Sequence, residues 1–134
     1  MDASLSPAAP VRVLVADDED DIRDLVCLAV AKAGCTVVRS LADGAEALAA
    51  ARAELPDLVV LDVSMPGATG LQVCEALRSD PATAGLRILL LSAGASSEDI
   101  ARGLAAGADA YLPKPFGVAA LVRQIRALTT GQAA

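Results

Sequence analysis

The sequence predicts an α/β fold: a doubly wound (βα)5 sandwich, with a five-stranded parallel sheet and helices on both of its faces. Five short apolar runs alternate along the chain with five segments whose apolar residues recur at helical spacing. Such alternation is typical of a parallel sheet covered on both sides. Right-handed crossovers leave few topologies, and we expect the strand order 2-1-3-4-5, which is already known for doubly wound folds of this size.

The expected strands are short and rich in valine, leucine and isoleucine. They lie at residues 11–16, 35–39, 57–62, 86–92 and 109–112. The third contains the uninterrupted apolar run Leu58 to Leu61, which indicates a strand buried on both faces. It therefore belongs near the middle of the sheet.

The expected helices are bounded by capping and turn residues. They lie at about 20–33, 43–55, 71–79, 96–107 and 116–130. Gly34 ends the first helix, and Asp80-Pro81 closes the third. Ser96 with Asp99 forms the start of a capping box for the fourth, and Gly131 ends the fifth.

The length of 134 residues predicts one domain without internal repeats. We expect a flexible N-terminal tail at residues 1–10, the domain at 11–130 and a C-terminal tail at 131–134. Hydrophobic residues make up 54% of the chain, but no run reaches the ~18 residues of a membrane helix. No basic segment leads into an apolar one at the N-terminus. These features predict a soluble, cytoplasmic protein without a membrane partner.

The composition also disfavours several functions. The net charge is −6, and the nine arginines and two lysines are scattered, which argues against nucleic acid as a direct partner. Three widely spaced cysteines without any histidine form no metal or disulfide pattern, so we expect reduced, buried side chains. The missing histidine excludes Ser-His-Asp and Cys-His catalysis.

Polar side chains follow four of the expected strands. Asp17 and Asp18 follow the first strand, Asp62 ends the third, Ser92 ends the fourth and Lys114 follows the fifth. In the order 2-1-3-4-5 the carboxyl ends of these strands form one rim, where open α/β sheets bind ligands. We expect no equivalent groups at the opposite ends of the strands.

This set of residues suits phosphoryl transfer to a carboxylate. Asp62 would attack the phosphorus and form an acyl phosphate. A divalent cation would separate the like charges, and Mg²⁺ prefers carboxylates and water. Asp18 is favoured as a direct ligand, and Asp17 would hold a metal-bound water; Asp62 and the backbone carbonyl of Ser64 would complete the protein ligands.

Lys114 and Ser92 would contact phosphate oxygens in this scheme. Each residue alone has a simpler explanation: an adjacent Asp pair is often a helix cap, an Asp at a strand end a turn former, a serine a helix-approach residue and a lysine a surface residue. Their common placement on one rim favours the functional interpretation.

Four segments resemble the receiver domain of two-component response regulators. They are Val15–Glu19, Leu61–Gly67, Leu91–Ala93 and Gly107–Phe116, and the resemblance covers about residues 11–130. It implies that Asp62 is the phosphoacceptor, that Asp17 and Asp18 bind Mg²⁺, and that Lys114 binds phosphate. It also implies that the Lys114–Pro115 peptide bond is cis.

The resemblance further implies a switch and partners. Ser92 would be the switch hydroxyl and Tyr111 the switch aromatic, which would fill the space that Ser92 vacates. The face formed by the fourth helix, fifth strand and fifth helix would then change shape. The implied partners are a histidine kinase or histidine phosphotransfer protein, a downstream output protein or domain, and a second copy of the chain in a phosphorylation-dependent homodimer.

Two other classes of protein are alternatives to a receiver domain: a phosphatase and a binding module. A phosphatase of the haloacid dehalogenase type needs a second Asp two residues after the nucleophile, where this chain has Ser64. A binding module that has lost phosphorylation is disfavoured by the complete set of rim residues. We therefore expect a protein that catalyses only its own phosphorylation and dephosphorylation. The small residues Ser64 and Gly94 predict an accessible site.

Overall fold

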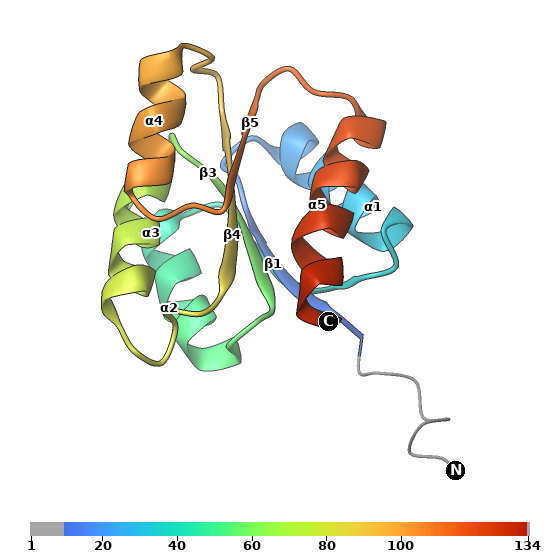
Figure 1. The fold of residues 1–134 in the computed structure, drawn as a ribbon, viewed down its shortest axis with the longest axis horizontal. Helices are drawn as coiled ribbons and strands as arrows, with labels where there is room; N and C mark the ends of the chain where they lie inside the picture. The colour runs from blue at the N-terminus through green and yellow to red at the C-terminus, as the bar shows by residue number, and fades with distance from the viewer. Residues whose placement is uncertain (1–9, 134) are drawn as a thin grey trace.

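The computed structural model describes residues 10–133 and contains one parallel sheet of five strands (Figure 1). The strands are β1 (Arg12–Ala16), β2 (Thr36–Leu41), β3 (Leu58–Asp62), β4 (Arg87–Ser92) and β5 (Ala110–Pro113). The helices are α1 (Asp20–Lys32), α2 (Gly44–Glu54), α3 (Gly70–Ser79), α4 (Ser97–Ala105) and α5 (Val118–Ala133). The strand order is β2-β1-β3-β4-β5, which confirms the predicted fold and order.

Helices α1 and α5 lie on one face of the sheet, and α2, α3 and α4 lie on the other (Figure 1). Successive strand residues therefore face two separate cores. In β3, Val59 and Leu61 face α2 and α3, whereas Leu58 and Val60 face α1 and α5. All four are fully buried, because a central parallel strand has no solvent-facing side.

Capping residues position three of the helices. The Asp43 side chain accepts a hydrogen bond from the Glu46 backbone N–H at the start of α2. The Ser96 hydroxyl accepts one from the Asp99 N–H at the start of α4, as predicted. Helix α3 begins with a capping box that was not predicted, in which Thr69 and Gln72 satisfy each other's backbone N–H groups.

Three expectations about the chain are corrected or left open. Helix α5 continues to Ala133, so the prediction that Gly131 ends it was wrong; a glycine inside a helix costs only about 1 kcal/mol and does not force an end. Cys27 and Cys35 are partly exposed, and only Cys74 is buried. The predicted N-terminal tail falls almost entirely on residues 1–9, outside the described part of the chain.

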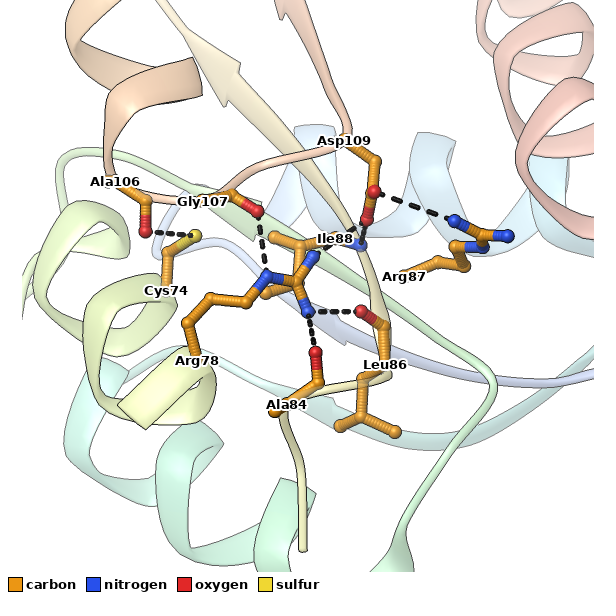
Figure 2. Close-up of polar contacts among 9 residues, drawn as sticks. All are labelled: Cys74, Arg78, Ala84, Leu86, Arg87, Ile88, Ala106, Gly107 and Asp109. Carbon is orange, nitrogen blue, oxygen red and sulfur yellow. Dashed lines mark hydrogen bonds and ion pairs between the residues drawn. The ribbon is translucent and has the colours of Figure 1, made fainter. Parts of the chain in front are cut away.

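The edge of the sheet opposite the carboxyl ends also carries charged groups, so the expectation that all such groups share one rim was wrong. Arg78 of α3 donates hydrogen bonds to the carbonyl oxygens of Ala84, Leu86 and Gly107 (Figure 2). It also pairs with the Asp109 carboxylate at 2.8 Å. These contacts tie α3 to the segments that enter β4 and β5.

No helix within residues 10–133 is long and apolar enough to cross a membrane.

Candidate functional site at the carboxyl ends of the strands

A hollow of about 320 Å³ lies at the carboxyl ends of the central strands. Its lining residues come from four separate connections and are Asp18, Glu19, Asp62, Ser64, Ala93 and Lys114. A wider hollow of about 680 Å³ lies between α1 and α5 and is lined by Lys32, Arg123 and Arg126 with small apolar side chains. The wider hollow has no carboxylate among its lining residues, so the chemistry expected from the sequence belongs to the smaller one.

Asp62 is the last residue of β3 and is 3% exposed. The strand places Asp62 at the edge of the hollow, and the next residue, Val63, is hydrogen-bonded through both its N–H and its carbonyl group. The Val63 N–H donates to the Leu91 carbonyl of β4, and the Gly70 N–H donates to the Val63 carbonyl. Gly70 packs directly against the Asp62 backbone, where a Cβ atom would overlap the Asp62 carbonyl oxygen. The backbone of Asp62, from which the carboxylate projects, is therefore held in place.

Lys114 follows β5, and its backbone N–H donates to the Ser92 carbonyl oxygen at 2.7 Å. The Lys114–Pro115 peptide bond is cis, as the resemblance implied. The ammonium Nζ lies 3.3 Å from Asp62 Oδ1, 3.1 Å from Asp17 Oδ2 and 2.9 Å from Glu19 Oε1. One cation thus faces three carboxylates.

Asp17 and Asp18 occupy different environments although they are adjacent. Asp17 is fully buried, and its Oδ1 accepts a hydrogen bond from the Glu19 N–H at 2.9 Å. Its Oδ2 is buried without a hydrogen bond and contacts the Lys114 ammonium as an ion pair at 3.1 Å. Asp18 is exposed at the mouth of the hollow.

The residues fit a hard divalent cation. Carboxylate oxygens of Asp17, Asp18, Glu19 and Asp62 all lie within 4.8 Å of one another. A buried carboxylate oxygen without a donor is costly unless something binds it, and Mg²⁺ takes carboxylate oxygens together with several waters. An all-oxygen set without histidine or cysteine is typical of Mg²⁺ rather than of a softer metal.

Ser92 and Tyr111 are linked through the Gly94 peptide groups. The Ser92 hydroxyl accepts a hydrogen bond from the Gly94 N–H at 3.0 Å, and the Tyr111 hydroxyl donates one to the Gly94 carbonyl at 2.7 Å. The Tyr111 ring packs against Gly103 of α4, where a Cβ atom would lie 2.7 Å from the ring. Ser92 is therefore turned toward the backbone and does not line the hollow.

The two small residues expected to open the site differ in placement. Ser64 lines the hollow, but Gly94 does not, and a Cβ atom at Gly94 would meet the Asp99 carboxylate instead. Glu19 also lines the hollow, although no role at the rim was expected for it. It belongs to the acidic run Asp17–Asp21, and nothing in that run signals that Glu19 turns back toward Lys114.

Burial and the nearby Asp17 charge raise the pKa of Asp62 to about 6, and the Lys114 ammonium only partly opposes them. For Lys114, burial lowers the pKa, but the hydrogen bond to Glu19, the close contact with Asp17 and the charges of Asp62 and Asp17 outweigh it and raise the pKa overall. The ammonium is therefore held in its charged form, while the Asp62 carboxyl group is easily protonated without a metal.

This predicts a pH-dependent stability for the metal-free protein. Between pH about 4 and about 6 the folded protein keeps a proton on Asp62 that the unfolded chain releases, so the free energy of unfolding falls as pH rises through this window. Relative to Asp62→Asn, wild-type protein should lose at most about 3 kcal/mol between these limits. Urea unfolding of both proteins measures the change in the free energy of unfolding, and ¹³C NMR titration measures the pKa of the Asp62 carboxyl group. An Asp62 carboxyl that titrates at or below its ordinary value would contradict it.

The fold and this site together define a class of small, doubly wound α/β domains with an acidic hollow at the carboxyl ends of the strands. The response regulator receiver domain family matches residues 13–126, and the chain belongs to this family. The assignment made from the four sequence segments is thereby confirmed.

Relatives and solved structures agree with the family. The chain is 44% identical to the transcriptional regulatory protein TcrX of Mycobacterium tuberculosis over 119 residues, which are 89% of this chain and 50% of that protein. It is 38% identical to the DNA-binding response regulator MtrA of Mycolicibacterium smegmatis over 116 residues, 87% of this chain and 49% of that protein. The chain thus spans about half the length of these curated relatives.

The solved receiver domain of NarL from Mycobacterium tuberculosis superposes with a TM-score of 0.85 at 34% identity, over 92% of this chain and 99% of that one. The chemotaxis response regulator CheY4 of Vibrio cholerae superposes with a TM-score of 0.82 at 34% identity, over 90% of this chain and 99% of that one.

Proposed function

We propose that Asp62 is the phosphoacceptor of this receiver domain and that it takes its phosphoryl group from a histidine kinase or a histidine phosphotransfer protein. The observation that carries the proposal is the meeting of a nearly buried Asp62 carboxylate with Lys114 Nζ at 3.3 Å, in a hollow that Asp18 also lines. A signalling carboxylate needs these neighbours, because its own charge repels the incoming phosphate.

The proposed reaction is a substitution at phosphorus. An oxygen of Asp62 bonds to the phosphorus, the bond from phosphorus to the donor histidine nitrogen breaks, and that nitrogen keeps the electron pair and takes up a proton. Lys114 binds an oxygen of the transferred group and positions it in line. Asp17, Asp18, Asp62 and the Ser64 carbonyl would hold Mg²⁺, which neutralises the charge that gathers on the phosphoryl oxygens. Attack of water on the phosphorus returns the Asp62 carboxylate and inorganic phosphate.

Acetyl phosphate with Mg²⁺ tests the proposal. Wild-type protein should gain the mass of one phosphoryl group, and peptide mapping should place it on Asp62. Asp62→Asn should gain none, whereas Asp24→Asn, which removes an exposed carboxylate of α1, should react like wild type. Phosphate on another residue, or none on the wild-type protein, would refute the assignment.

The proposal extends to a switch. The phosphoryl group carries a charge of about −1.5 to −2, and its oxygens can recruit the Ser92 hydroxyl. Ser92 would then leave the Gly94 N–H, and the Gly94 carbonyl that binds Tyr111 would move with it. The face formed by α4, β5 and α5 would change through this peptide link.

Tyr111→Ala should take up phosphate at a rate within about twofold of wild type but fail to change this face. Beryllofluoride with Mg²⁺ imitates the phosphoryl group, and amide chemical shifts of α4 and α5 report the response. We expect the α4 and α5 shifts to stay near their unliganded positions in Tyr111→Ala, while shifts around Asp62 change as in wild type. Parallel loss of both responses would contradict a switch role.

The partners of the whole protein are proposals as well. Relatives of about twice this length are transcriptional or DNA-binding regulators by name. We infer that the α4–β5–α5 face acts on an output domain or protein, and that a phosphorylation-dependent homodimer through this face is one form of that output. The expectation of no direct nucleic-acid contact applies to the acidic domain alone and stays a prediction, as does the cytoplasmic location.

A further inference from the structure

Glu19 makes the shortest of the three contacts to the Lys114 ammonium. Its Oε1 accepts a hydrogen bond from Nζ at 2.9 Å, whereas Asp17 and Asp62 lie at 3.1 and 3.3 Å. Lys114, the cation expected to bind the phosphoryl group, therefore makes its closest contact with Glu19, which is not the expected phosphoacceptor. A role of Glu19 in starting α1 would not explain this contact.

The Glu19 side chain is not used by the helix that it precedes. Glu19 is the N-cap residue of α1, yet its side chain accepts no hydrogen bond from the backbone. The cap is made by the backbone, since the Glu19 carbonyl accepts a hydrogen bond from the Arg23 N–H. The carboxylate instead crosses the mouth of the hollow to a lysine 95 residues further along the chain.

Charge and exposure make this contact reversible. The Glu19 side chain is 61% exposed, while the Lys114 side chain is 13% exposed. Glu19 can therefore turn into water at little cost, whereas Lys114 stays at the site. Lys114 is the only cation among the residues that line the hollow, and Glu19 adds one more negative charge where an anionic donor must enter.

We propose that Glu19 is a positioning residue that holds Lys114 in the unphosphorylated protein and competes with the incoming phosphoryl group for it. Glu19 thus slows phosphorylation by small anionic donors and releases Lys114 once Asp62 is phosphorylated. The inference rests on the proposed role of Asp62. It assigns to this residue of the acidic run a function that the other exposed members of the run do not share.

The test compares Glu19→Gln with Asp21→Asn. Glu19→Gln keeps the size and an acceptor oxygen but removes the charge. Asp21 is exposed in the first turn of α1, two residues further along, so Asp21→Asn removes the same charge from the same helix end without a contact to Lys114. At saturating Mg²⁺, the initial rate with acetyl phosphate should rise about two- to fivefold in Glu19→Gln, as expected for a partly exposed ion pair. The gain should appear mainly as a lower half-saturating donor concentration.

A second readout needs neither metal nor donor. The chain has two lysines, Lys32 and Lys114, so NMR of the lysine ammonium groups gives two signals. In metal-free protein the Lys114 ammonium protons should exchange with water several-fold faster in Glu19→Gln than in wild type or Asp21→Asn. The exposed Lys32 signal should be the same in all three proteins.

The outcomes separate the inference from the proposed function. No phosphate on Asp62 in any of the three proteins would overturn the proposed function itself. Phosphorylation at equal rates in Glu19→Gln and Asp21→Asn, or unchanged ammonium exchange, would overturn only the role of Glu19. A slower reaction of Glu19→Gln together with weaker Mg²⁺ binding by calorimetry would also overturn it, because Glu19 would then be a metal ligand.

Discussion

Gly70→Ala should lower the free energy of unfolding by about 3 kcal/mol and displace the Asp62 backbone. The added Cβ atom would overlap the Asp62 carbonyl oxygen and lie 2.9 Å from the Val63 Cα atom. Both are backbone atoms at the end of β3, which cannot turn aside as a flexible side chain could. Overpacking of this kind costs about 1–3 kcal/mol or more, which exceeds the ~1 kcal/mol that alanine gains in helix propensity.

Gly85→Ala is the matched control. No atom lies within 4 Å of a Cβ atom at Gly85, and its φ angle is not in the left-handed region. Its unfolding free energy should stay within about 0.5 kcal/mol of wild type in urea denaturation. Gly70→Ala should also phosphorylate more slowly than Gly85→Ala, because the acceptor oxygen has moved. A Gly70→Ala protein as stable and as reactive as the control would show that the strand end is pliable.

Arg78→Met should cost about 2–4 kcal/mol of stability. The Arg78 guanidinium donates four hydrogen bonds, one of them to the Asp109 carboxylate at 2.8 Å. Methionine keeps the length of the apolar stem but leaves three carbonyl groups without this donor and removes one partner of Asp109. Arg78→Lys should recover less than half of the loss, because one ammonium cannot reach acceptors spread around a planar fork.

Arg102→Met is the control for the Arg78 variants. The Arg102 side chain is 60% exposed and, within residues 10–133, pairs only with Asp99 at 3.4 Å, one turn away on α4. Its loss should change the unfolding free energy by no more than about 0.5 kcal/mol. Thermal and urea unfolding of the three variants against wild type decide the comparison. A loss in Arg78→Met as small as that in Arg102→Met would mean that water replaces the network without cost.

Local patterns were enough to predict the fold, because the strands are continuous apolar runs and the helices begin and end at turn residues. The placement of Asp62 and Lys114 at the rim was also predictable, since Asp62 ends β3 and Lys114 follows β5 directly. What the patterns could not reveal depends on side-chain direction. Glu19 lies among four aspartates, and nothing in their order indicates which one turns back to the rim.

The opposite edge was missed for a related reason. Arg78 lies inside a helix and Asp109 directly before β5. Both are ordinary surface residues by sequence, and only the tertiary fold brings them together. The prediction that Gly131 ends the last helix was wrong because glycine allows a helix to end but does not require it to. The sequence therefore did not predict side-chain contacts between distant segments such as Arg78 and Asp109. It did predict which residues meet at the carboxyl ends of the strands.

The two cores described for the sheet have a mechanical consequence at β5. Tyr111 packs against the core under α2 and α3, and its neighbour Leu112 packs against the core under α1 and α5. At four residues, β5 is an edge strand bonded only to β4, so it can slide while breaking fewer backbone bonds than any inner strand. Strand β5 therefore connects the two cores near α4 and α5, and we expect a displacement of Tyr111 on one face of the sheet to move Leu112 on the other.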